Sequence, residues 1–370
     1  MSEQELRDFG GRIQRLINGQ DLEGREAYEM FRDVLLDRQP ELQQGAFLAA
    51  LVAKGETVDE IVGAWRAIDE IDTVHEDVRG GAVFENSGTG MDRLKTFNVS
   101  SAAAIVAAAC GVTMARHGAR AITSRCGTVD ILEAVGIDVE CEPSVVGQSI
   151  RTAGIGIFNG MSSRVHPGAL GRILSRIRFG STLNIAASLA HPCRPNQGLR
   201  GVYAERLVPK VSEVMRSVGY EKGLVVHGRD RATGFGMDEI SILGETTAVR
   251  FDGEKRESFT LNPEDVDLRA ASYEEIAASN DIAQEAVRFV QVLAGRGNRA
   301  CGDFTCLNAG AVLWISGVST SIAQGVGMSR ECIGAGRAIG KLREWVRAQS
   351  PEHKGSERLE RLLEQADIPA

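Results

Sequence analysis

A loop rich in small residues, 87–92 (SGTGMD), precedes an alanine-rich segment at 102–109. Alanine favours helix, and Asn98 or Ser100 is a suitable residue to cap its first turn. Gly111 is suited to the left-handed backbone that ends a helix. The first N–H groups of a helix have no partner within it and lie at the positive end of its dipole. The junction of this loop with the helix therefore predicts a phosphate-binding site.

Two adjacent carboxylates, Asp238 and Glu239, follow an apolar run at 224–226 (LVV) that is typical of a buried strand. In α/β proteins, ligands bind near the carboxyl ends of parallel strands. Magnesium is held by one or two carboxylates together with water and ligand phosphates. The pair is consistent with a magnesium site, and a solvated acidic turn is the alternative interpretation.

Several cations stand near predicted strand and helix ends. Arg116 and Arg120 follow a run at 112–115 that we interpret as a strand, and Arg176 lies in a basic helical segment at 167–178. The planar guanidinium group matches the geometry of phosphate and carboxylate. These arginines are candidate anion-binding residues.

Three of the six histidines, His117, His166 and His227, adjoin glycine or proline turns beside predicted strand ends. A single histidine more often packs or forms a structural hydrogen bond than acts as a catalyst. Their shared position nevertheless indicates a pocket.

The composition is that of an ordinary soluble globular protein, with 370 residues, 43% hydrophobic and 25% charged. A formal charge of −8 argues against nucleic acid as the main partner. The first residues, MSEQELRDFGGR, do not resemble a signal peptide, and no apolar run reaches the roughly 18 residues that span a bilayer. Seven scattered cysteines predict reduced thiols without a zinc site, and we expect a cytoplasmic protein.

The pattern of the chain changes near residue 81. Residues 1–75 show helical periodicity throughout, with Thr57 as the cap of one helix. Short apolar runs then alternate with helical segments, which predicts a largely parallel sheet flanked by helices. The later expected elements are strands at 240–243 and 247–251 and helices at 129–135, 273–294, 307–318 and 330–348.

This interpretation gives an α/β protein with a smaller all-α domain. The helical domain comprises residues 1–75 and is joined by the segment 165–178. The α/β domain comprises residues 76–350. Residues 351–370 form a polar C-terminal tail, in which Leu359, Leu362 and Leu363 indicate a possible last helix.

Taken in order, these segments resemble the anthranilate phosphoribosyltransferase family over nearly the whole chain. Gly88-Thr89-Gly90 with Asp92 resembles its GTGGD loop, and TFNVSS at 96–101 resembles its TFNIST helix start. The further matches are GAFL at 45–48, KGET at 54–57, HG at 117–118 with Arg120, Gly127 with Asp130, Leu132 and Glu133, GMDE at 236–239, and LNA at 307–309. Each motif is weak alone, but their order over this length is specific.

The resemblance implies a magnesium-dependent transfer of a phosphoribosyl group from phosphoribosyl pyrophosphate to anthranilate, in a homodimer formed through the helical domain. Ser100, Asp238 and Glu239 would then contact Mg²⁺. His117, Ala119 and Arg176 would line the acceptor site. The implied donor-binding residues are Gly88, Thr89, Gly90, Asp92, Thr96, Asn98, Ser100, Ser101, Arg116 and Thr128.

The chain departs from the family pattern at positions near the donor and acceptor. Met91 stands where the family loop has glycine, and Arg116 replaces a lysine. Ala119 replaces an asparagine, Cys126 replaces a serine, and residues 182–189 (TLNIAASL) lack the family's Gly-Pro. Two alternatives therefore stand beside anthranilate transfer. One is a paralogue acting on another aromatic or heterocyclic amine, and the other is a non-catalytic protein that binds phosphoribosyl pyrophosphate or nucleic acid on the same fold.

Overall fold

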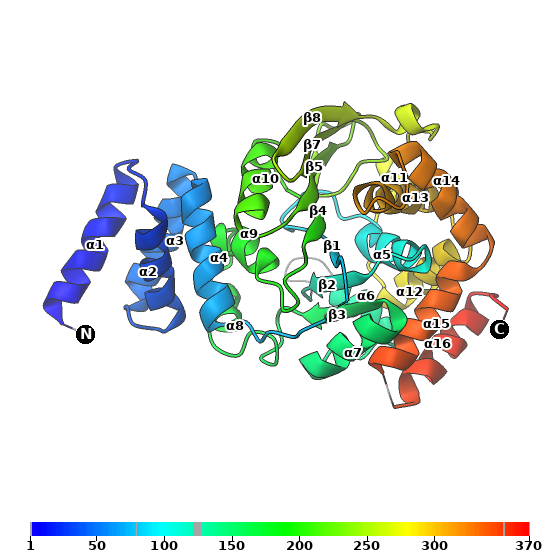
Figure 1. Cartoon of the computed structure of the whole chain (residues 1–370), viewed down its shortest axis with the longest axis horizontal. Coiled ribbons are helices and arrows are strands. Elements are labelled where there is room, and N and C mark those ends of the chain that lie inside the picture. The colour runs from blue at the N-terminus through cyan, green and yellow to red at the C-terminus, as the bar shows by residue number, and fades with distance from the viewer. Residues whose placement is uncertain (1, 79, 121–126, 351, 370) are drawn as a thin grey trace.

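The computed structural model describes residues 2–78, 80–120, 127–350 and 352–369. A small helical domain stands at one end of a larger α/β body (Figure 1). It consists of α1 (Glu3–Ile17), α2 (Gly24–Leu35), α3 (Glu41–Lys54) and α4 (Val58–Ile71), together with α8 (Leu170–Ile177) and α9 (Thr182–Leu189). Thr57 caps α4 as predicted, because its side chain accepts the N–H of Glu60 at 3.2 Å.

The carboxylate of Asp72 accepts hydrogen bonds from the segment that leads the chain back into the helical domain. Asp72, just after α4, accepts the N–H groups of Ala169 and Leu170 at 3.0 and 2.8 Å. Leu170 and Leu183 then join the same apolar core as Phe31. The helical domain is therefore built from two separate stretches of the chain.

The α/β body contains a sheet in the order β3-β2-β1-β4-β5-β7-β8, with β6 paired to β5. Strands β1 to β5 are parallel, whereas β6, β7 and β8 run antiparallel. The strands are β1 (Phe84–Gly88), β2 (Met114–Gly118), β3 (Ile155–Asn159), β4 (Gln197–Gly201), β5 (Lys222–Arg229), β6 (Gly236–Met237), β7 (Thr246–Asp252) and β8 (Lys255–Leu261). The predicted fold class is confirmed, with antiparallel strands added at one edge.

The order of the parallel strands reverses at β1. From β1 the chain builds outward through β2 and β3, and it then returns to place β4 and β5 on the other side. Ligands of open α/β sheets bind in the crevice at such a reversal, beyond the carboxyl ends of the strands. The loop after β1 begins at this point.

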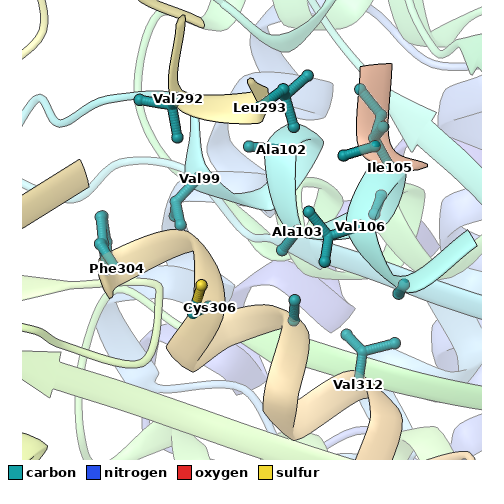
Figure 2. Close-up of a cluster of buried hydrophobic side chains, with 14 of the residues drawn as sticks. Val99, Ala102, Ala103, Ile105, Val106, Val292, Leu293, Phe304, Cys306 and Val312 are labelled. Atoms are coloured by element: carbon teal, nitrogen blue, oxygen red, sulfur yellow. The ribbon is translucent and has the colours of Figure 1, made fainter. Parts of the chain in front are cut away.

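Helix α5 (Val99–Ala109) is the buried centre of the α/β body. Residues 99–108 of this helix are all buried. Its alanines allow α13 to approach closely, and Figure 2 shows Ala103 and Val106 facing Cys306 and Val312 of α13. The other helices are α6 (Thr128–Ala134), α7 (Pro143–Ala153), α10 (Leu207–Ser217), α11 (Tyr273–Ile276), α12 (Ile282–Leu293), α13 (Arg299–Ile315), α14 (Ile322–Gly334), α15 (Arg337–Gln349) and α16 (Lys354–Gln365), with a 3₁₀ turn at Pro263–Val266.

Several predicted elements differ from the structure. The strand expected at 112–115 lies two residues later, as β2, and the strand expected at 240–243 is absent. In that segment the N–H groups of Ile240 and Ser241 donate to side chains of Asn308 and Thr246, so they are not available to a sheet ladder.

Two predicted helices are each divided. The helix expected at 273–294 is split into α11 and α12, because residues 277 and 278 leave the helix to bond the chain at Thr96 and Lys95. The helix expected at 330–348 is split between α14 and α15 at Gly336, whose φ is +72°. Glycine adopts this left-handed conformation without the steric cost that other residues incur.

The segment after residue 350 differs from the predicted polar tail. It forms α16, and Leu359, Leu362 and Leu363 are buried in the core shared with α12 and α15. The possible last helix is therefore present and belongs to the α/β body.

Candidate active site

The loop after β1 is joined to the segment that contains the two carboxylates. The N–H of Thr89 donates to the carbonyl of Gly201 at 3.0 Å, and the N–H of Gly90 donates to Asp238 Oδ2 at 2.7 Å. Gly88 has to be glycine here, because a Cβ on it would lie only 2.0 Å from Asp238 Oδ2. The predicted loop and the predicted acidic pair thus form one site.

The start of α5 completes the same site. Asn98 caps the helix, with its side chain accepting the N–H of Ser101 at 3.3 Å. Ser100 lies in the first turn, and its Oγ donates to Glu239 Oε1 at 2.7 Å. Gly111 ends the helix with φ +97°, as predicted. The hydrogen bond of Ser100 therefore brings the first turn of α5 against the acidic pair.

Three carboxylates lie near one another at this site, those of Asp92, Asp238 and Glu239. They repel one another and are partly removed from water. Burial, together with the charge of Asp238, raises the pKa of Asp92 to about 7. Burial, again with the charge of Asp238, raises the pKa of Glu239 to about 8, and burial raises that of Asp238 itself. Lys95 gives partial compensation, since its Nζ lies 3.3 Å from Asp92 Oδ1. This local excess of negative charge favours binding of a cation.

The residues present fit magnesium. Within the described residues, no group of three or more His, Cys, Asp or Glu side chains is arranged to hold a metal ion by itself. Asp238 and Glu239 supply hard carboxylate oxygens, and burial raises the pKa of both, so a bound cation would stabilise their charged forms. Magnesium takes one or two carboxylates and completes its shell with water and phosphate oxygens. Asp238, Glu239 and the Ser100 hydroxyl are the groups that would hold it.

Two of the predicted donor-binding residues bond to each other beneath the loop. The Arg116 guanidinium donates to Ser101 Oγ and to the carbonyl of Asn86. Arg116 is fully buried, which lowers its pKa to about 10. In this structure Arg116 fixes the carboxyl end of β1 against the start of α5.

The other predicted donor-binding residues lie around the same strand ends. Thr96 forms a bridge with Ala277 that holds the chain ahead of α5. Thr128 opens α6, and its methyl group lies 2.8 Å from the position of a Cβ on Gly118, at the end of β2. Cys126 lies outside the described residues.

The predicted acceptor residues have different surroundings. His117 is buried, with Nε2 facing Nε2 of His166 at 3.2 Å, and burial lowers its pKa well below the usual value. Ala119 is exposed after β2. Arg176 is exposed near the end of α8, and its guanidinium pairs with Glu41 of α3. The structure thus places Arg176 on the helical domain and His117 on the sheet.

Met91 makes a contact that the sequence did not indicate. It has φ +72°, and its Sδ and Cε lie 2.1 and 2.0 Å from the position that a Cβ on Gly180 would occupy. Gly180 precedes α9, so Met91 links the loop after β1 to the helical domain. A methionine at a glycine position of the loop was the available sequence signal.

A buried ion pair beneath the loop was also missed. Arg200 of β4 donates to Glu85 Oε2 of β1 at 2.6 Å and to Ser87 Oγ, and both charged side chains are fully buried. Arg200 also reaches the carbonyl of Ser188 in α9. A charged residue inside each of two adjacent parallel strands was the signal that could have revealed this pair.

Comparison with known families agrees with this geometry. Residues 80–339 match the model of the glycosyl transferase family a/b domain, and residues 12–70 match the model of its helical bundle domain. The chain belongs to this glycosyl transferase family. It is 32% identical over 347 residues to an anthranilate phosphoribosyltransferase of Methanothermobacter marburgensis, which covers 91% of this chain and 98% of the relative. It is 36% identical over 324 residues to the Geobacillus stearothermophilus enzyme of that name, covering 87% and 92%.

Solved structures of glycosyl transferase family members share the fold. Anthranilate phosphoribosyltransferase from Thermus thermophilus has a TM-score of 0.82 and 30% identity, covering 91% of this chain and 99% of that one. The Saccharomyces cerevisiae enzyme in complex with PRPP and Mg has a TM-score of 0.80 at 22% identity, covering 95% and 99%. The predicted family and the predicted enzyme class, a pentosyl-transferring glycosyltransferase, are confirmed.

Proposed function

We propose that this glycosyltransferase moves the phosphoribosyl group of phosphoribosyl pyrophosphate to anthranilate, with Mg²⁺ as cofactor, as in tryptophan biosynthesis. The observation that supports this most is the pairing of Gly90 with Asp238 and of Ser100 with Glu239. These contacts bring the loop after β1 and the start of α5 against Asp238 and Glu239, as a joint site for phosphates and Mg²⁺ would require. The names of the relatives at 32–36% identity support the same donor and acceptor.

The chain itself acts by position and charge. The donor's phosphates would bind at the start of α5 and would compete with Asp238 for the N–H of Gly90. Bound magnesium supplies positive charge that neutralises the departing pyrophosphate. Asp92 lies close enough to Asp238 for their charges to interact, and its carboxylate would accept a hydrogen bond from a water or a ribose hydroxyl. No covalent intermediate with the protein is needed, so catalysis depends on orientation and electrostatic stabilisation.

The acceptor would enter between the sheet and the helical domain. Arg176 is the cation that would receive its carboxylate, after release from Glu41. His117 and Ala119 at the end of β2 would form the opposite wall. This arrangement requires the helical domain to approach the sheet, and Met91 already connects the two through Gly180.

A second candidate is transfer to a different aromatic or heterocyclic amine. Two observations favour it: Ala119 is a small exposed side chain, and Met91 occupies space between the donor loop and α9. Both changes alter the volume available beside the acceptor.

The decisive experiment measures pyrophosphate release from phosphoribosyl pyrophosphate and Mg²⁺ across a panel of aromatic amines. Turnover with anthranilate supports the first proposal. Turnover only with another amine overturns anthranilate as substrate and supports the second. Tight donor binding by calorimetry without turnover on any amine would overturn both and identify a binding protein. An Arg176→Ala variant should raise KM for anthranilate while leaving donor binding unchanged.

We also propose a homodimer formed through the helical domain. Four of the exposed large apolar side chains lie there: Ile17, Leu36, Leu42 and Val52. Leu42 is the most exposed of these four, at 88%. Light scattering after chromatography tests this, and Leu42→Glu should shift a dimer towards monomer.

A cytoplasmic location remains part of the proposal. The described cysteines, including the partly exposed Cys193, are free thiols, which suits a reducing compartment. Among the described residues, no helix combines the length and apolar character needed to cross a membrane. Fractionation of cells that produce the tagged protein would test the location.

A further inference from the structure

Three thiols come together at the end of α5 opposite the phosphate site. Cys110 follows the last turn of α5, Cys306 lies on α13, and Cys332 lies on α14. Cys332 Sγ is 3.9 Å from the carbonyl oxygen of Val106, and the same oxygen accepts the N–H of Cys110 at 3.1 Å. Cys110 and Cys332 therefore both contact the carbonyl oxygen of Val106.

The surroundings of Cys110 make it the reactive member of this cluster. It is partly exposed, whereas Cys306 and Cys332 are buried. A hydrogen bond with the Cys332 thiol lowers the pKa of Cys110 to about 7, and the nearby positive charge of Arg337 acts in the same direction, against Glu331. The thiolate is the nucleophilic form of cysteine. The lowered pKa increases the fraction of Cys110 that is thiolate near neutral pH.

Two other partly exposed cysteines provide a contrast within the same chain. Burial raises the pKa of Cys141 to about 12, and burial also raises that of Cys193. No hydrogen bond to another thiol contributes at either position. Exposure alone therefore does not select Cys110. What distinguishes it is the adjacent second sulfur.

We propose that Cys110 and Cys332 form a site of reversible oxidation, at which a peroxide converts the two thiols into a disulfide. The Cys110 thiolate attacks one oxygen of the peroxide, the O–O bond breaks, and Cys110 becomes a sulfenic acid. With hydrogen peroxide, the other oxygen leaves as hydroxide, which takes a proton from the solvent and becomes water. The Cys332 sulfur then attacks the Cys110 sulfur, the S–O bond breaks, and a second water leaves with the thiol proton. The two sulfurs together lose two electrons, and these reduce the peroxide.

The disulfide would link the end of α5 to α14. The first turn of α5 contains Asn98 and Ser100, so the bond would fix the helix that carries the proposed phosphate site at its other end. The oxidation site lies outside the proposed active site and does not depend on which acceptor is used.

The test treats the full-length protein with hydrogen peroxide near pH 7, blocks the remaining thiols with N-ethylmaleimide, and maps peptides by mass spectrometry without reduction. We expect one peptide pair joined through Cys110 and Cys332, and its loss on treatment with dithiothreitol. In Cys332→Ser, Cys110 should instead be trapped as a sulfenic acid by dimedone. In Cys110→Ser, which alters a partly exposed side chain, no linked Cys332 peptide should form.

Cys141→Ser is the matched control, and it should oxidise at the rate of the unmodified protein. The proposal is overturned if Cys110 stays as open to alkylation as Cys141 after peroxide treatment. It is also overturned if the main product joins Cys110 to Cys306 or to any other cysteine. Because the unmodified protein gives the primary result, poor folding of a variant does not affect it.

Discussion

Ser100 donates a hydrogen bond to Glu239 at 2.7 Å, although 139 residues separate the two in the chain. Ser100 belongs to the first turn of α5, and Glu239 belongs to the segment that crosses the ends of β4 and β5. The backbone carbonyl oxygen of Asp238 lies so close to Gly201 that a Cβ added to Gly201 would be only 1.6 Å from that oxygen. This close contact holds the segment of Asp238 and Glu239 against the end of β4. In the proposed function, the contact of Ser100 with Glu239 would join the donor-binding and metal-binding residues.

The first prediction concerns the metal. Asp238→Asn and Glu239→Gln keep the volume of each side chain but remove a negative charge. We expect the Mg²⁺ concentration for half-maximal rate to rise about tenfold or more, because loss of groups that hold a metal typically has effects of this size. Initial rates against Mg²⁺ at fixed donor and amine measure this. Asp252→Asn, a change at a partly exposed residue of β7, is the control and should leave the metal dependence unchanged. An unchanged metal dependence in Glu239→Gln would instead show that Glu239 does not belong to the metal site.

The second prediction concerns Met91, which has φ +72° where the family loop has glycine. Met91→Gly removes the side chain that lies against Gly180 and allows closer approach of the loop to the pyrophosphate. We expect the Kd of the donor to fall about threefold to tenfold, equivalent to about 0.7–1.4 kcal/mol. Calorimetry with phosphoribosyl pyrophosphate and Mg²⁺ provides the measurement.

Asp367→Gly is a suitable control for Met91, because Asp367 is also non-glycine with a positive φ of 57° but lies near the C-terminal end. It should leave donor affinity unchanged. Weaker donor binding in Met91→Gly would show instead that the contact with Gly180 supports the bound state.

The third prediction concerns the buried pair Glu85–Arg200, in which both side chains are fully buried. Arg200→Leu leaves the Glu85 carboxylate without its partner, and we expect a loss of about 3–5 kcal/mol in the free energy of unfolding. The double variant Glu85→Leu with Arg200→Leu should recover much of that loss, since no uncompensated charge remains. Urea unfolding measures both. The two residues are not coupled as described if their effects simply add. In that case the free energy of unfolding of the double variant would be lower than that of Arg200→Leu by the whole loss that Glu85→Leu causes on its own.

The fourth prediction concerns acid sensitivity. His191 is buried and neutral: Nδ1 accepts the N–H of Cys193 at 3.0 Å, and Nε2–H donates to the carbonyl of Ala115 at 3.0 Å. Burial lowers its pKa to about 3, while an unfolded histidine has a pKa of about 6.5. As the pH falls, the unfolded state therefore binds a proton on His191 before the folded state does. The stabilising contribution of His191 is complete above about pH 6.5 and is lost as the pH falls towards 3, at about 1.4 kcal/mol for each pH unit.

His191→Asn removes the titrating group but keeps an amide that can donate to Ala115. Urea unfolding at pH 7 and pH 5 should show a smaller loss of stability in this variant than in the unmodified protein. His353→Asn, at an exposed position before α16, should leave the pH dependence unchanged. An identical pH dependence in His191→Asn would show that His191 is not protonated on unfolding.

Much of the site was predictable because its components are local. Asn98 and the N–H of Ser101 are three residues apart, so the cap of α5 depends only on the residues around it. Gly111 ends the helix for a similarly local reason. The ordered motifs also indicated the family, and the alternating pattern indicated the α/β class.

The remaining features depend on distant segments. The division between α11 and α12 arises because residues 277 and 278 bond the chain ahead of α5, and the helical periodicity of 273–294 contains no sign of that partner. Arg116 is buried against Ser101 in the structure, a contact that the sequence did not indicate. The direction of its side chain depends on where α5 lies relative to β2.

The sequence by itself therefore determined where helices are capped and ended, which residue types carry charge, and the family to which those motifs belong. The tertiary structure decided which of those residues meet: Ser100 with Glu239, Gly90 with Asp238, and Met91 with Gly180. The physical reason is that caps and turns depend on backbone groups a few residues apart. Contacts between residues that lie far apart in the chain depend instead on strand order and register, which only the packed sheet establishes.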